Sequence, residues 1–265
     1  MDKLKRYLGF VGICLIVASC SSDSDNIDSF QDTVDSFSAL TQHLSVPDHF
    51  LDGDFTRMES DFDVNIYFTV LDHLSMEPGY VLDYVYRLDH LGGGPVIYAR
   101  TSDQLPYARY EDFLDAIQGL YQPTYEPSWY GADYLEHVVV DDTAEGYFQL
   151  AVLYVLGDQF YLYWHANYND YMIVCNQDGL DAVWDSVDAS FGGENVTFGL
   201  RQKARGLDLE PTVELKEDVA VVRFVTFTKW GGFSEVVYTI SREFPHRIVD
   251  WEGEILLEYD CGVVF

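Results

Sequence analysis

The chain has 265 residues, of which 48% are hydrophobic, and it carries 45 acidic against 15 basic side chains, a formal charge of −30. This hydrophobic content excludes a disordered acidic tail and indicates a globular protein with a large core. The negative charge argues against nucleic acid and bare anionic lipid as partners, because it repels phosphates, whereas cations, basic peptides and neutral glycans are compatible with it.

The N-terminus follows the layout of a secretory signal peptide. Lys3, Lys5 and Arg6 form a positive head, an apolar run follows over residues 7–18, and small residues then lead to Cys20. A transmembrane helix needs about 20 apolar residues, and the run ends before that length is reached. The sequence therefore predicts a cleaved leader over residues 1–19.

The stretch Val17-Ala18-Ser19-Cys20 resembles the lipobox of bacterial lipoproteins. The resemblance covers only the leader and the residues just after it. It implies that Cys20 becomes the lipid-carrying first residue of an exported protein, and that this lipid is the protein's contact with the membrane. Ser21 after the cysteine implies the outer membrane, and the Ser- and Asp-rich residues that follow are similar to export signals of lipoproteins displayed on the cell surface. A plain cleaved signal with an unmodified Cys20 is the alternative.

Charge is distributed unevenly along the mature chain. Residues 20–200 hold 32 acidic and four basic side chains, whereas residues 201–265 hold 12 acidic and eight basic ones. We therefore expect an acidic Ser- and Asp-rich tether over 20–29, an acidic α+β region over 30–200 and an antiparallel β region over 201–265. The last two regions are expected to belong to one domain.

Periodicity predicts the elements that follow the tether. Helical spacing and strand-like alternation indicate helices over 30–44, 110–121 and 180–187, and strands over 80–88, 96–100, 213–216, 219–228, 234–242 and 255–265. Asp178 is the expected N-cap of the third helix. Residues 62–70 fit a strand or a helix, and a turn is expected at the glycines 92–94. Helices followed by hairpins predict an α+β fold, in which N-terminal helices and strands pack with a C-terminal antiparallel sheet.

The aromatic segment 161–171 is the most suggestive candidate for a ligand site. Flat aromatic faces stack on sugar rings, and amides and carboxylates hydrogen-bond to hydroxyls. The candidate binding residues are Tyr161, Tyr163, Trp164, His165, Asn167, Asn169 and Asp170. The alternative is a hairpin, with a strand over 160–164, a turn over 167–170 and a return strand after it, and the two interpretations are compatible.

Two cysteines remain in the mature chain after Cys20. If Cys175 and Cys261 pair outside the cytoplasm, the long loop that they close stabilises the fold by roughly 4–5 kcal/mol on the chain-entropy model. Two buried free thiols are the alternative, because both cysteines lie in apolar runs. The acidic clusters at 52–54 and 141–145 offer oxygen ligands for weak calcium binding, but neither follows the EF-hand pattern, and solvated loops are expected instead.

No catalytic motif, metal site or cofactor site is predicted. Two Leu-Asp-His-Leu repeats, at 71–74 and 88–91, place Asp beside His, but adjacent side chains point apart on a helix or a strand. The favoured function is a noncatalytic, lipid-anchored binding or interaction module at the cell envelope, with a glycan or a basic protein as partner. Two alternatives stay open.

The first alternative is an envelope glycan hydrolase that uses a carboxylate pair which the sequence does not identify. Such an enzyme should show a deep pocket that holds one carboxylate of raised pKa. The second alternative is an acidic inhibitor or immunity-like protein that captures a basic partner by charge complementarity.

Overall fold

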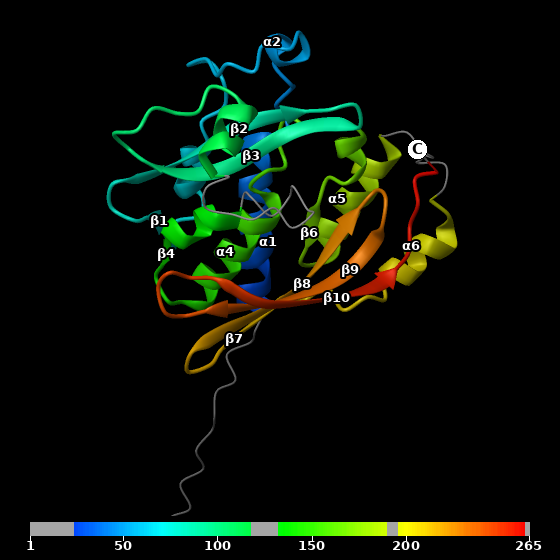
Figure 1. Cartoon of the computed structure of the whole chain (residues 1–265). Coiled ribbons are helices and arrows are strands. Elements are labelled where there is room, and N and C mark those ends of the chain that lie inside the picture. Colours follow the sequence, from blue (N-terminus) through cyan, green and yellow to red (C-terminus); the bar gives the residue numbers. More distant parts are fainter. Residues whose placement is uncertain (1–23, 118–131, 190–195, 263–265) are drawn as a thin grey trace, which may run out of the picture.

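The computed structural model describes residues 24–117, 132–189 and 196–262, so the predicted leader and Cys20 lie outside the described residues. It confirms a mixed α+β fold with a C-terminal antiparallel sheet (Figure 1). The helices are α1 (Ser24–Thr41), α2 (Asp48–Leu51), η1 (Val64–Thr69), α3 (Tyr110–Ile117), η3 (Ala132–His137), α4 (Ala144–Leu156), η4 (His165–Tyr168), α5 (Gln177–Asp188) and α6 (Phe198–Ala204). The strands are β1 (Leu74–Met76), β2 (Tyr80–Leu88), β3 (Gly92–Thr101), β4 (Val138–Val140), β5 (Tyr163–Trp164), β6 (Met172–Val174), β7 (Thr212–Leu215), β8 (Val219–Thr228), β9 (Gly232–Ser241) and β10 (Ile248–Leu257).

The strands form three antiparallel sheets. In the large sheet the order is β10-β9-β8-β6, and β7 also pairs with β8. The hairpin sheet has the order β2-β3-β5, and β1 pairs with β4 as a separate ribbon. Met172 in β6 is paired with Phe227 in β8, so the predicted regions 30–200 and 201–265 share one sheet.

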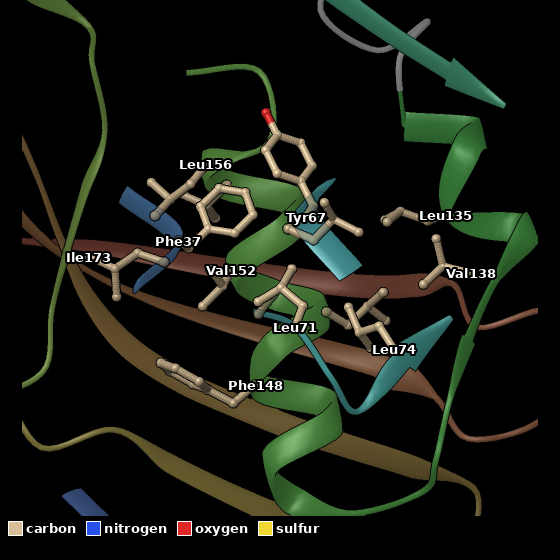
Figure 2. Packing of buried hydrophobic residues seen from close by; sticks show 14 of the residues in the cluster. Phe37, Tyr67, Leu71, Leu74, Leu135, Val138, Phe148, Val152, Leu156 and Ile173 are labelled. Carbon is tan, nitrogen blue, oxygen red and sulfur yellow. The ribbon is translucent and has the colours of Figure 1, made fainter. Parts of the chain in front are cut away.

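Helix α4 lies at the centre of the fold. Every residue from 146 to 153 is buried, as expected for a helix that is apolar on all sides. Figure 2 shows Phe148, Val152 and Leu156 along one side of α4, directed toward α1 and β6. The helix therefore joins elements that are far apart in the sequence into one core.

Side-chain alternation in the large sheet separates two cores. On β8, Val222 and Phe224 belong to the central core around α4, whereas Val225 and Phe227 pack on the opposite face with α5. The hairpin sheet repeats this division, because Tyr84 faces the central core and Val85 packs against α3. The layers therefore run from α3 through the hairpin sheet, α1 with α4, and the large sheet to α5 with α6.

Several predicted boundaries are corrected by the structure. Helix α1 begins at Ser24, inside the segment expected to be a tether; Ser and Asp are favoured in the first turn of a helix as well as in flexible segments. The glycines 92–94 start strand β3 instead of forming the turn. The last strand is Ile248–Leu257 and not residues 255–265, so the prediction overlaps it only over residues 255–257. Asn176 caps α5 in place of Asp178, by accepting a hydrogen bond from the Gly179 N–H at 2.9 Å.

Two further predictions concern a segment that fits either a strand or a helix and a helix that extends past the described residues. The ambiguous segment 62–70 folds as the 3₁₀-helix η1, whose N-cap Asp63 accepts a hydrogen bond from the Asn65 N–H. The predicted helix 110–121 is described as far as Ile117. Within the described ranges, no helix is both long enough and apolar enough to cross a bilayer.

Both cysteines of the described chain are buried free thiols. Cys175 lies in the central core, and Cys261 lies in the core on the α5 side of the large sheet. The sheet therefore separates the two residues, and the structure has no disulfide between them. Burial raises the pKa of the Cys175 thiol well above its ordinary value.

Candidate ligand cavity

The aromatic segment that the sequence singled out connects two sheets and does not form a hairpin. Tyr163 and Trp164 pair with Gly93 and Gly92 of the hairpin sheet, whereas the next strand, β6, pairs with the large sheet. The backbone is left-handed at Tyr161 (φ 52°) and at Trp164 (φ 58°), which interrupts the alternation on which the predicted strand 160–164 depends. The hairpin prediction is therefore wrong.

The candidate residues of this segment have different surroundings. Tyr161 is buried and structural: its hydroxyl accepts a hydrogen bond from the Phe62 N–H (3.1 Å), and its carbonyl accepts one from the Tyr86 hydroxyl (2.9 Å). Asp170 forms an ion pair with Lys229 at 3.0 Å, and desolvation raises its pKa although Lys229 opposes the shift. The remaining candidates lie at the surface or beside a cavity: Tyr163, Trp164, His165, Asn167 and Asn169.

A cavity of about 650 Å³ opens at the edge of strand β3. Strand β5 pairs only with Gly92 and Gly93, so the edge beyond them is not covered by β5. The lining residues are Arg87, Asp89, Leu91, Gly92, Gly93, Gly94, Pro95, Val96, Ile97, Tyr134, Tyr154, Asp158, Gln159, Leu162, His165, Ala166 and Asn169. Apolar walls with a few polar groups are typical of small-molecule sites.

The backbone register explains why this edge stays open. The Asp89 N–H donates to the Gly92 carbonyl at 2.9 Å, and alternation along the antiparallel pair then directs the backbone groups of Gly93, Pro95 and Ile97 away from β2. Pro95 has no N–H to donate, so another strand cannot pair fully at this position. The edge is therefore suited to line a cavity and poorly suited to extend the sheet.

Asp158 is the most distinctive polar group of the cavity. It follows the C-terminus of α4 and lines the cavity, where the residue is exposed to solvent. Desolvation raises its pKa, and a hydrogen bond from the Gln159 amide (2.8 Å) only partly opposes this effect. The negative end of the α4 dipole also disfavours a carboxylate at this position.

Two tyrosines near Asp158 hydrogen-bond to the end of α4. The Tyr67 hydroxyl donates to the Gly157 carbonyl at 2.7 Å, and the Tyr134 hydroxyl donates to the Leu153 carbonyl at 3.2 Å. The tyrosine protons therefore point at the helix and not at Asp158. This arrangement leaves the carboxyl group available to a molecule in the cavity.

A second carboxylate of the cavity has the opposite environment. Asp89 accepts a hydrogen bond from the Leu91 N–H (2.8 Å) and pairs with Arg87 at 2.6 Å. The backbone hydrogen bond is the main reason why the pKa of Asp89 is lowered, and Arg87 adds to it. The cavity thus holds one carboxyl group whose pKa is raised, that of Asp158, and one whose pKa is lowered, that of Asp89.

An exposed aromatic side chain stands beside the cavity. The Trp164 indole contacts the His165 ring in an edge-on arrangement with centroids 4.9 Å apart, and His165 lines the cavity. The left-handed backbone of Trp164 is costly for a residue with a Cβ atom. Such strain persists only where surrounding structure enforces it, and it is concentrated at functional sites.

The acidic clusters and the Asp-His repeats have structural partners. His73 contacts Asp141 across the fold at 2.6 Å, while its sequence neighbour Asp72 is 3.9 Å away. Asp142 pairs with Arg242 at 2.7 Å. In the described part of the chain, no group of three or more His, Cys, Asp or Glu residues is arranged to hold a metal ion.

The sequence predicts two of the polar residues that line this cavity and misses its charged residues. His165 and Asn169 were candidates, but Asp158, Asp89 and Arg87 were not. The available signal was the polar pair at 158–159 that directly follows a long apolar run. No protein-family model matches the chain, and no curated protein or solved structure matches it either.

Proposed function

We propose that this protein is an exported binding protein, anchored by lipid on Cys20, whose cavity beside β3 takes a glycan or another small polyhydroxylated ligand. The observation that carries the proposal is the lining of the cavity: tyrosines and aliphatic walls surround a carboxyl group, two amides and an ion pair. Sugars need both kinds of contact, because their ring faces are apolar and their hydroxyls donate and accept hydrogen bonds.

The electrostatics of the chain favour a neutral ligand in this cavity. The formal charge of −30 repels anions, and Asp89 already neutralises Arg87 at the cavity wall. Desolvation raises the pKa of the Asp158 carboxyl group, and in its protonated form this group donates a hydrogen bond as well as accepting one. The exposed indole of Trp164 adds a stacking surface next to His165.

A thermal-shift assay with a panel of soluble oligosaccharides tests the binding function. A ligand at 100 times its Kd adds about 2.7 kcal/mol of stability, which corresponds to a rise in Tm of about 5–11 °C for a domain of this size. Trp164→Ala and Asp158→Asn should each abolish the shift. Trp251→Ala is the matched control, because Trp251 is as exposed as Trp164 (56% and 58%) but lies on β10, which contributes no residue to the cavity, whereas Trp164 is next to the lining residue His165. Loss of the shift in all three variants, or no shift with any sugar, contradicts the proposal.

Glycan hydrolysis is a second candidate function, favoured by one specific observation. The cavity contains a carboxyl group whose pKa is raised, Asp158, and a carboxylate whose pKa is lowered, Asp89. Opposite shifts of this kind separate a proton donor from an ionised partner in glycosidases. Release of 4-methylumbelliferone from aryl glycosides separates the two candidates: turnover that Asp158→Asn abolishes while sugar binding persists supports hydrolysis, and binding without turnover supports the binding function.

The membrane anchor has its own test. Intact-mass measurement of the protein from its native host should show a diacylglyceryl-modified chain that begins at Cys20. Cys20→Ala should release the protein from the membrane fraction without changing the Tm of the folded part. An unmodified Met1 or a bare Cys20 thiol contradicts the anchoring proposal and leaves the cavity proposal standing.

A further inference from the structure

Strand β10 forms an exposed edge of the large sheet (Figure 1). It spans ten residues, and β9 is its one neighbour among the described strands. Residues 249–255 are exposed on both sides of the strand. A long edge of this kind presents unpaired backbone N–H and C=O groups to another chain.

The two faces of β10 differ in chemistry. Trp251 is paired with Tyr238, and Ile255 with Ser234, on the face that also carries the central core. Trp251 and Ile255 are 56% and 61% exposed. A Cβ atom on Gly253 would lie 3.1 Å from the Trp251 indole, so this ring extends across Gly253 toward Ile255. The result is a continuous apolar strip along the edge.

The other face of β10 is acidic. Asp250, Glu252 and Glu254 point to this side, and all three are exposed. Among the described residues, none of the three forms an ion pair. The edge therefore combines an apolar strip on one face with three acidic side chains on the other, of which Asp250 accepts a hydrogen bond from the Trp251 N–H at 2.9 Å.

We infer that β10 docks an extended basic segment of another protein, which adds a strand to the large sheet. Such a segment has alternating side chains: apolar ones beside Trp251 and Ile255, and lysine or arginine beside Glu252 and Glu254. Main-chain hydrogen bonds supply affinity in this mode of recognition, and alternate side chains supply specificity. The formal charge of −30 attracts a basic partner and accelerates its association.

A second copy of this chain fits the edge poorly. Pairing β10 with itself places Asp250, Glu252 and Glu254 of one copy against the same residues of the other copy. Like charges directly opposite each other destabilise a strand pair. The acidic face therefore discourages self-association and selects a partner of opposite charge. This surface is separate from the cavity, so the inference does not depend on the ligand proposed above.

Fluorescence anisotropy with synthetic ten-residue peptides tests the inference on the detergent-solubilised full-length protein. A labelled peptide of alternating Lys and Val should bind, and a peptide of the same composition in two blocks should bind at least tenfold more weakly. N-methylation of every second amide removes the backbone donors and should cause a similar loss. Binding of the alternating peptide should weaken as salt rises.

Charge-reversal variants locate the site. Glu252→Lys with Glu254→Lys should weaken binding of the Lys/Val peptide at least tenfold and create binding of an alternating Glu/Val peptide. The matched control is Asp112→Lys with Asp115→Lys on α3, which changes the net charge equally at exposed positions behind the hairpin sheet. The control should alter the Kd less than threefold.

Three outcomes overturn the inference. Equal losses of peptide affinity in the two double variants show that binding depends only on the overall charge of the protein. Equal affinity of the N-methylated peptide shows that no strand is added. Concentration-dependent dimers in sedimentation velocity, abolished by Trp251→Ala, show that a second copy occupies the edge.

Discussion

Asp83 is a buried carboxylate that two arginines share, and replacing it should destabilise the fold strongly. Its side chain is 4% exposed and pairs with Arg57 and with Arg100, whose Nε lies 2.8 Å away. Both arginine side chains are only 18% exposed, and the Arg57 guanidinium also stacks on the Tyr84 ring. The ion pairs join the segment after α2 to both strands of the hairpin that forms the cavity wall.

The magnitude follows from what Asp83→Asn leaves behind. The amide keeps the size of the side chain but not its charge, so two largely buried guanidinium groups lose their shared counter-ion. Breaking a buried pair in this way costs about 3–5 kcal/mol. For a domain of this size, each kcal/mol lowers Tm by about 2–4 °C, so the expected loss is about 6–20 °C.

Thermal unfolding followed by circular dichroism measures this loss. The matched control is Asp188→Asn, because Asp188 pairs with Arg201 at 2.7 Å while its own side chain is 52% exposed. A solvent-exposed pair contributes about 0–1 kcal/mol, so the control should change Tm by no more than about 4 °C. The reasoning is refuted if Asp83→Asn lowers Tm no further than Asp188→Asn does.

Three other outcomes are expected. Gly93→Ala should lower the free energy of unfolding in urea by about 1–3 kcal/mol, because the added Cβ would lie 2.7 Å from the buried Tyr86 hydroxyl. Gly94→Ala should be nearly neutral, because its Cβ would meet only Leu162, at 3.4 Å. Equal effects of the two substitutions contradict this account of the glycines. The folded-state pKa of Asp158 is raised, so the folded state holds the proton more tightly than the unfolded state, and stability should fall as pH rises above about 4. Asp158→Asn should therefore gain stability relative to wild type between pH 4 and pH 7, and parallel pH profiles contradict that. Cys175 should react with a thiol reagent only as fast as the protein unfolds, because it is buried and its thiolate is disfavoured; rapid labelling of the native protein refutes this.

Local patterns in the sequence predict the strands of the large sheet better than they predict α4, the helix at the centre of the fold. The alternation over 219–228 gives the bounds of β8 because one face of that strand meets each core. Helix α4 is buried on every side, so its apolar residues show no helical period, and the sequence pattern predicts no helix there. The end of β10 was misplaced because its residues are exposed on both faces and the buried Tyr259 and Cys261 follow it.

The cavity could not be predicted from the sequence for a related reason. Its walls come from the β2–β3 hairpin, from η3, from the end of α4 and from the segment around β5, which lie up to 82 positions apart between Arg87 and Asn169. Local patterns carry no information on which distant segments meet. The aromatic segment 161–171 was singled out for its composition, and part of it does border the cavity because β5 pairs with the glycines of β3.

The course of α1 determines how the proposed lipid-anchored form would stand on a bilayer. Near the start of α1, Phe30 contacts Phe148, which in turn contacts Phe224 of the large sheet. Two turns later, Phe37 contacts Tyr67, whose hydroxyl donates to Gly157 at the C-terminus of α4. Ser24 follows Cys20 by four positions, a reach of at most about 14 Å even in an extended chain. In the proposed lipid-anchored form, so short a connection would hold the start of α1, and with it the large-sheet side of the central core, close to the lipid headgroups.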